Sequence, residues 1–90
     1  MRKSVVVTGW VQGVGFRWRA KTAAGALGVT GWVRNDFNGA VSMELQGTEE
    51  QIDALLAAVE RGAYVNIESL RVKNLPTVEN ETGFYVLDDA

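Results

Sequence analysis

The residues best suited to chemistry in this sequence lie in a short glycine-rich segment and in the arginine that follows it. Gly13 and Gly15 flank Val14 in the segment Gln12–Gly15, and Arg17 comes two residues later. Glycines allow backbone N–H groups to turn toward a common point, where they bind anions. The planar guanidinium of an arginine offers a fork of donors that matches phosphate oxygens. The segment is therefore a candidate phosphate site, although taken alone it also fits a tight turn followed by a solvated arginine.

Asn35 is the second candidate for a chemical role. It precedes the segment Asp36–Gly39, which ends in Asn-Gly, the dipeptide most typical of tight hairpins. A polar residue at the entrance of a hairpin often bonds only to its own backbone. Beside an anion site, however, its side-chain oxygen can accept a hydrogen bond from a water, and its nitrogen can donate to a phosphoryl oxygen. Asn35 thus has both a structural and a catalytic interpretation.

The composition excludes several other chemistries. The chain of 90 residues has no cysteine and no histidine, so it offers no thiol nucleophile, disulfide, phosphohistidine or zinc site. A net charge of −2 and a pI of about 5.0 disfavour a nucleic-acid partner, which needs a basic surface. No apolar run is long enough to span a membrane, and the N-terminus lacks the apolar stretch of a signal peptide. We therefore expect a cytoplasmic protein without nucleic-acid or membrane partners, folded as one domain over residues 1–90.

The residue pattern predicts two helices and five strands. Apolar residues recur at helical spacing in the stretches 16–27 and 52–59. Gly28 and Gly62 are expected to end these helices, and Thr48 with Gln51 forms a capping box for the second. The residues expected to face the core are Phe16, Ala20, Ala23, Ala24 and Leu27 in the first helix and Ile52, Leu55, Leu56 and Val59 in the second. Runs of β-branched or alternating residues predict strands at 4–11, 30–35, 40–46, 65–72 and 84–87.

The order of these elements predicts the fold class. Strand, helix, strand, strand, helix, strand is typical of the ferredoxin-like βαββαβ sandwich, an α+β fold. In this fold an antiparallel sheet carries both helices on one face, and the last predicted strand is an addition to it. A strand–helix–strand unit runs parallel, so the carboxyl ends of strands 4–11 and 30–35 lie at the same edge. With the third strand between them, their backbones are about 10 Å apart. Arg17 and Asn35 are therefore expected to reach toward each other across a gap that fits a phosphate group.

Two longer motifs contain these residues. Residues 9–17 read GWVQGVGFR and residues 31–39 read GWVRNDFNG, followed by Val41 and Gly47. Both resemble the signature segments of the acylphosphatase family, and together with the element order the resemblance covers nearly the whole chain. It implies hydrolysis of the carboxyl-phosphate bond of acyl phosphates to a carboxylate and inorganic phosphate. The implied mechanism is in-line attack of water, without a metal or any other cofactor.

The resemblance also implies roles for particular residues. Arg17 matches the arginine that binds the phosphate, and Asn35 matches the asparagine that orients the attacking water, so both are expected to be catalytic. The remaining residues that it assigns to phosphate binding are Gln12, Gly13, Val14, Gly15 and Phe16. It implies a small-molecule acyl phosphate as substrate, inorganic phosphate as product and inhibitor, and a monomeric protein.

The sequence is also compatible with two other classes of function. Ferredoxin-like domains also serve as binding modules for RNA or regulatory ligands, although the acidic pI weighs against RNA. Domains of this kind also form accessory parts of larger maturation enzymes, but from the length of the chain we expect a free-standing enzyme. Finally, we expect Trp10, Trp32 and Phe37 to serve packing, and Asp88 and Asp89 to form a solvated tail.

Overall fold

The alternation of β-rich runs and helical periodicities produces seven elements, which the computed structural model describes over residues 1–90. The elements are β1 (Arg2–Trp10), α1 (Phe16–Leu27), β2 (Thr30–Asn35), β3 (Val41–Gln46), α2 (Glu49–Glu60), β4 (Asn66–Leu75) and β5 (Phe84–Val86). The left-handed Gly28 caps the end of α1, and Thr48 and Gln51 form the expected capping box before α2. Neither helix has the length and apolar character that crossing a bilayer requires.

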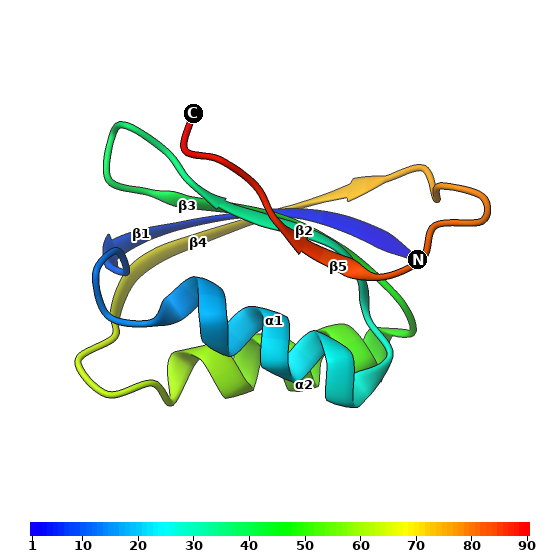
Figure 1. Ribbon diagram of the computed structural model, residues 1–90, viewed down its shortest axis with the longest axis horizontal. Coiled ribbons are helices and arrows are strands. Elements are labelled where there is room, and N and C mark those ends of the chain that lie inside the picture. The colour runs from blue at the N-terminus through cyan, green and yellow to red at the C-terminus, as the bar shows by residue number, and fades with distance from the viewer.

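One five-stranded sheet with the order β4-β1-β3-β2-β5 forms one of the two layers of the molecule. β3 pairs antiparallel with both β1 and β2, so it lies between them as expected, and β4 pairs antiparallel with β1. Both helices cover the same face of this sheet (Figure 1). The ferredoxin-like fold is therefore confirmed.

β5 makes the sheet mixed rather than antiparallel throughout. It pairs parallel with β2, with Gly31 opposite Phe84 and Val33 opposite Val86. The reason is the path of residues 76–83, which carry the chain from the end of β4 to the opposite edge of the sheet (Figure 1). The chain thus enters this edge in the same direction as β2.

The core lies between the sheet and the helices. Each helix contributes the apolar face predicted from its spacing, and the inward residues of β1, β2 and β3 complete the layer. The buried members of this cluster are Val5, Val7, Val11, Phe16, Ala20, Ala24, Val29, Val33, Val41, Met43, Leu45, Ile52, Leu55, Val59 and Phe84. The core therefore supports the end of β1 and the start of α1, which flank the glycine-rich segment.

β1 begins at Arg2, two residues earlier than its apolar pattern indicates. Arg2 is only 4% exposed and pairs in register with Gln46 of β3 and Leu75 of β4. Its guanidinium bonds to Glu44 at 2.9 Å and to Glu81 at 2.7 Å. Burial of this charge is tolerated because two carboxylates surround it.

The limits of β4 also differ from those predicted. The strand begins at Asn66 rather than Val65, because Tyr64 adopts a left-handed conformation and the Val65 amide bonds back to Gly62. It continues to Leu75, immediately before Pro76, which has no N–H to extend the ladder. β4 is an edge strand that pairs only with β1, and most of its side chains are exposed.

Two of the three aromatic residues expected to serve packing do not. Trp10 is 58% exposed at the end of β1, where its ring lies against that of Tyr64, and Phe37 is 84% exposed in the β2–β3 hairpin. Trp32 is partly buried, with the Arg34 guanidinium over its ring. The expectation failed because Trp10 is the last residue of β1 and Phe37 lies beyond the end of β2, so neither belongs to the core cluster.

Candidate active site

The glycine-rich segment forms a bent loop between β1 and α1. Gly13 and Gly15 both have positive φ angles, 73° and 79°, which side-chain-bearing residues rarely adopt. Gly15 is the N-cap residue of α1, and no side chain caps this end of the helix. The first turn contains no acidic residue either. The loop therefore places the uncapped start of α1 close to the end of β1.

The amides of this helix start are available to a ligand. The first backbone bond at this end runs from the Arg19 amide to Gly15, and the amides of Phe16, Arg17 and Trp18 donate no hydrogen bond within the chain. Free N–H groups and the positive end of the helix dipole together favour a bound anion.

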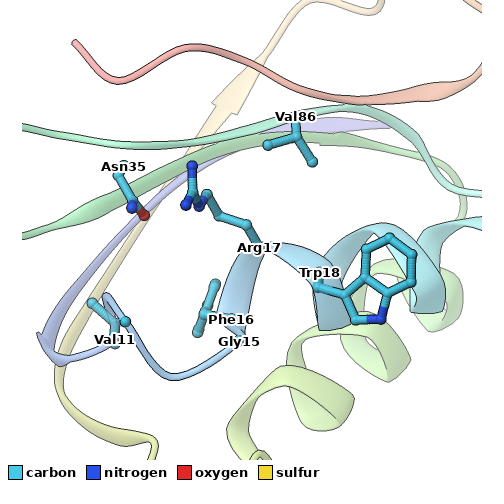
Figure 2. A pocket seen from close by; sticks show the side chains of 8 residues that line it. Val11, Gly15, Phe16, Arg17, Trp18, Asn35 and Val86 are labelled. Carbon is cyan, nitrogen blue, oxygen red and sulfur yellow. The ribbon is translucent and has the colours of Figure 1, made fainter.

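A cavity of about 300 Å³ opens in front of these amides. Its lining comes from the loop, the first turn of α1, the end of β2 and β5, as Figure 2 shows. The lining residues are Val11, Gly13, Gly15, Phe16, Arg17, Trp18, Asn35 and Val86. Arg17 and Asn35, which are 18 residues apart in the sequence, thus share one pocket as the parallel arrangement of β1 and β2 requires.

Asn35 closes β2 and contributes a buried polar atom to this pocket. The residue is 8% exposed, and its Oδ1 has no hydrogen-bond partner in the protein. A buried amide oxygen without a partner costs about 1–3 kcal/mol, so such groups call for a functional explanation. Oδ1 is an acceptor, and the group that satisfies it must therefore be a donor such as water.

The C-terminal tail brings a carboxylate to Arg17. Asp89 Oδ1 lies 3.3 Å from Nη1 of Arg17, and both side chains are partly exposed. Asp88 and Asp89 are exposed, as expected of a solvated tail, but Asp89 also pairs with Arg17 because the tail continues along β2 after β5. Its backbone is held by Leu87 N–H to the Val33 carbonyl at 2.9 Å and by Ala90 N–H to the Asn35 carbonyl at 3.1 Å. An acidic group therefore competes for the guanidinium that faces the pocket.

Gln12 and Val14 do not line the pocket. The side-chain amide of Gln12 donates to the Asp36 carbonyl at 2.7 Å and to the Ala40 carbonyl at 2.8 Å. It thereby ties the loop to the β2–β3 hairpin and fixes the loop relative to Asn35. Val14 packs against the hydrophobic core. Phosphate binding by the backbone amides of these two residues stays a prediction.

The structure adds pocket residues that the sequence did not reveal. Val11, Trp18 and Val86 line the cavity, and Asp89 contacts Arg17. Trp18 follows Arg17 directly, and its position off the apolar helix face was a usable signal. Val86 and Asp89 depended on the path of the tail, which no periodicity indicates. No group of three or more His, Cys, Asp or Glu side chains is arranged to hold a metal ion.

Comparisons with known proteins agree with this geometry. The family model described as acylphosphatase matches residues 3–86. A protein of Clostridium acetobutylicum named acylphosphatase is 38% identical over 87 residues, which are 96% of each chain. The crystal structure of an acylphosphatase from Bacillus subtilis superposes with a TM-score of 0.87 at 28% identity, covering 96% of this chain and 97% of that one. An acylphosphatase structure from Coxiella burnetii gives 0.84 at 30% identity, covering 96% and 90%.

Proposed function

This chain belongs to the acylphosphatase family of hydrolases, which act on acid anhydrides, and we propose that Arg17 and Asn35 are its catalytic residues. In this proposal Arg17 and the loop of residues 12–16 bind the phosphate of an acyl phosphate. Asn35 holds the water that attacks phosphorus. The folded unit of residues 1–90 contributes every group that the reaction uses.

The unpartnered Oδ1 of Asn35 is the observation that carries the proposal. Asn35 lines the same 300 Å³ cavity as Arg17 and the residues of the α1 start, whose amides are free. Donors for an anion therefore lie on one side of the cavity and an acceptor for water lies on the other. A purely structural asparagine at a hairpin entrance would have satisfied its oxygen locally.

The proposed reaction is a single displacement at phosphorus. The water oxygen forms a bond to phosphorus while the bond between phosphorus and the carboxyl oxygen breaks. The carboxylate leaves with the electron pair, and one proton of the water passes to a phosphoryl oxygen. The products are a carboxylate and inorganic phosphate. Because the phosphate product would occupy the same donors, it is expected to inhibit competitively.

The leaving group explains why so few side chains suffice. A carboxylate is the conjugate base of an acid with a pKa of about 4, so it departs without a general acid. What remains is to position the water and to stabilise charge on the phosphoryl oxygens. The first task falls to Asn35, and the second to Arg17 and the amides. A monomer is the proposed active form, because Arg17, Asn35 and the free amides of the α1 start can all come from one copy of the chain.

The test is hydrolysis of acetyl phosphate and benzoyl phosphate by the purified protein in the presence of EDTA. We expect turnover that survives the chelator, with inorganic phosphate as a competitive inhibitor. Arg17→Lys should lose nearly as much kcat/KM as Arg17→Ala, because a point charge cannot reproduce the guanidinium fork. Arg19→Lys, outside the pocket on the same helix, is the matched control. Activity that chelation abolishes and a divalent cation restores would contradict the metal-independent mechanism, and a fully active Arg17→Lys variant would contradict the role of Arg17.

A further inference from the structure

Trp18 is an exposed tryptophan beside the proposed phosphate site. It lies in the first turn of α1, next to Arg17, and 72% of its surface is exposed. It packs into no part of the core cluster, yet it lines the cavity together with Val86 of β5. Apolar and aromatic side chains that line a cavity together with a few converging polar groups are typical of ligand contacts.

The direction of the reaction tells which part of a substrate would reach Trp18. In an in-line displacement the attacking and leaving oxygens lie on opposite sides of phosphorus. If Asn35 holds the water, as the proposed function states, the acyl group must point away from Asn35. Figure 2 shows Asn35 and Trp18 on opposite sides of Arg17, with Val86 above the cavity. The leaving acyl group is thus directed toward Trp18 and Val86.

We propose that Trp18 and Val86 form a subsite for the acyl group and that this subsite favours acyl phosphates with an aromatic acyl group. This inference rests on the proposed function, because it uses the position of the water. The indole offers a flat apolar face on which an aromatic ring can stack, and the Val86 side chain closes the space above it. Phe37 is a second exposed aromatic near the site, but it follows Asn35 in the hairpin, on the side of the water, and does not line the cavity.

Contact with the acyl group should act mainly on binding. A ring that stacks on Trp18 is held in the ground state and the transition state alike, so its loss raises KM more than it lowers kcat. The phosphate contacts are made by other groups. The subsite therefore shows itself in the ratio of kcat/KM for benzoyl phosphate to that for acetyl phosphate, whose methyl group is too small to cover the indole.

The experiment measures this ratio in the parent protein and in Trp18→Ala. We expect the ratio to fall about tenfold in Trp18→Ala, chiefly through KM for benzoyl phosphate. Trp18→Phe, which keeps a flat ring, should recover most of the loss. Trp10→Ala removes another exposed tryptophan, which lies outside the cavity, and is the matched control, with the parental ratio expected.

Three other outcomes would contradict the acyl subsite or the proposed function. If the parent hydrolyses both substrates and Trp18→Ala keeps its ratio, the acyl subsite is wrong while the proposed function stands. If Phe37→Ala lowers the ratio instead, the acyl group points toward the hairpin and the assignment is also overturned. A parent protein that hydrolyses neither substrate contradicts the proposed function itself and removes the basis of the subsite.

Discussion

The pocket contains several hydrogen-bond donors and one hydrogen-bond acceptor that has no partner in the protein. The donors are the amides at the start of α1 and the guanidinium of Arg17. The acceptor is Oδ1 of Asn35, which is buried and whose protein environment offers it no N–H or O–H. The backbone of Asn35 is held by its pairing with Val41 of β3 and by a hydrogen bond from the Ala90 amide. Asn35 is thus rigid on the backbone side and unsatisfied on the pocket side, as a residue that orients water should be.

Replacement of Asn35 by alanine should separate turnover from binding. We expect kcat of Asn35→Ala to fall about 10²–10³-fold, since an interaction made on the way to the transition state is lost. Inhibition by phosphate should change less than about threefold, and the free energy of unfolding by about 1 kcal/mol or less, because the lost oxygen had no partner.

The matched control for this substitution is Asn38→Ala in the same hairpin. Asn38 Oδ1 accepts from the Ala40 amide at 3.0 Å, so this variant should lose stability and keep kcat. Steady-state kinetics and urea unfolding of both variants give the comparison. A folded Asn35→Ala protein with parental kcat would make Asn35 a structural residue and leave the mechanism without its water.

Asp89 should weaken anion binding at Arg17. Removing its negative charge in Asp89→Asn frees the guanidinium and is expected to tighten inhibition by phosphate about two- to fivefold at low salt. The effect is small because an exposed ion pair contributes about 0–1 kcal/mol and is screened by salt. Asp88→Asn makes the same change of net charge without an ion pair and is the control. Weaker phosphate inhibition in Asp89→Asn would show instead that Asp89 holds Arg17 in its productive position.

At the scale of elements, a glycine in the sheet and a glycine in the first helix have opposite structural demands. Gly31 in β2 has φ 135°, and a Cβ there would lie 1.8 Å from the Glu44 carbonyl oxygen of β3. Gly25 lies in α1 with nothing within 4 Å of its Cβ position. We expect Gly31→Ala to destabilise by about 3 kcal/mol or to prevent folding, and Gly25→Ala to stabilise by about 0.5–1 kcal/mol. Urea unfolding curves check both; equal effects of the two substitutions would contradict the close approach of β2 and β3.

The elements that could be predicted from the sequence are those with a strong local signal. The helical spacing of Phe16, Ala20 and Ala24 and the glycine after Leu27 define α1 without tertiary information. The start of β1 could not be found in this way, because Arg2 is buried only by virtue of Glu44 and Glu81, which are far away in the sequence. No local sequence pattern indicated the edge of the sheet at which β5 pairs either.

In the candidate site, too, some features could be predicted from the sequence and others could not. Gly13, Gly15, Phe16, Arg17 and Asn35 line one cavity, and they could be predicted because motif and topology place the ends of β1 and β2 at one edge. The hydrogen bonds of the Gln12 side chain and the contact of Asp89 could not be predicted. They depend on the shape of the hairpin and on the route of residues 76–90 across the sheet.

At the scale of the whole molecule, an ion network around the buried Arg2 joins the first strand to the segment between β4 and β5. Arg2 bonds to Glu44, Glu81 and Gln46, and Gln46 exchanges hydrogen bonds with the backbone of Val78. This network fixes residues 76–83 at the end of the sheet where β1 begins. The pocket lies at the other end, where β1 and β2 finish. It therefore determines where β5 begins, and with it the position of Val86 and of the tail that reaches Arg17.

Glu81 makes the stability of this arrangement dependent on pH. Burial alone would raise the pKa of Glu81, but hydrogen bonds from Arg2 and Thr30 and the charge of Arg2 outweigh it and lower the pKa below its ordinary value of 4.5. The folded state thus favours the ionised carboxylate more than the unfolded chain does. The resulting stabilisation is fully present above about pH 5 and is lost as the pH falls through the folded-state pKa.

Glu81→Gln is therefore expected to lower the free energy of unfolding by about 1–2 kcal/mol at pH 7, because the ion pair with the buried Arg2 is replaced by a hydrogen bond from Arg2 to an uncharged acceptor. As the pH falls below 4.5 and then through the lowered pKa of Glu81, the parent protonates this residue and comes to resemble the variant, so the difference between the two proteins should shrink toward zero. Glu79→Gln, at an exposed residue of the same segment without an ion pair, should follow the parent at every pH. Urea unfolding at pH 7, 5, 4 and 3 measures these differences. A Glu81→Gln deficit that stays constant from pH 7 to pH 3 would mean that the residue stabilises by packing, and that the ion pair with Arg2 contributes nothing to the position of the tail.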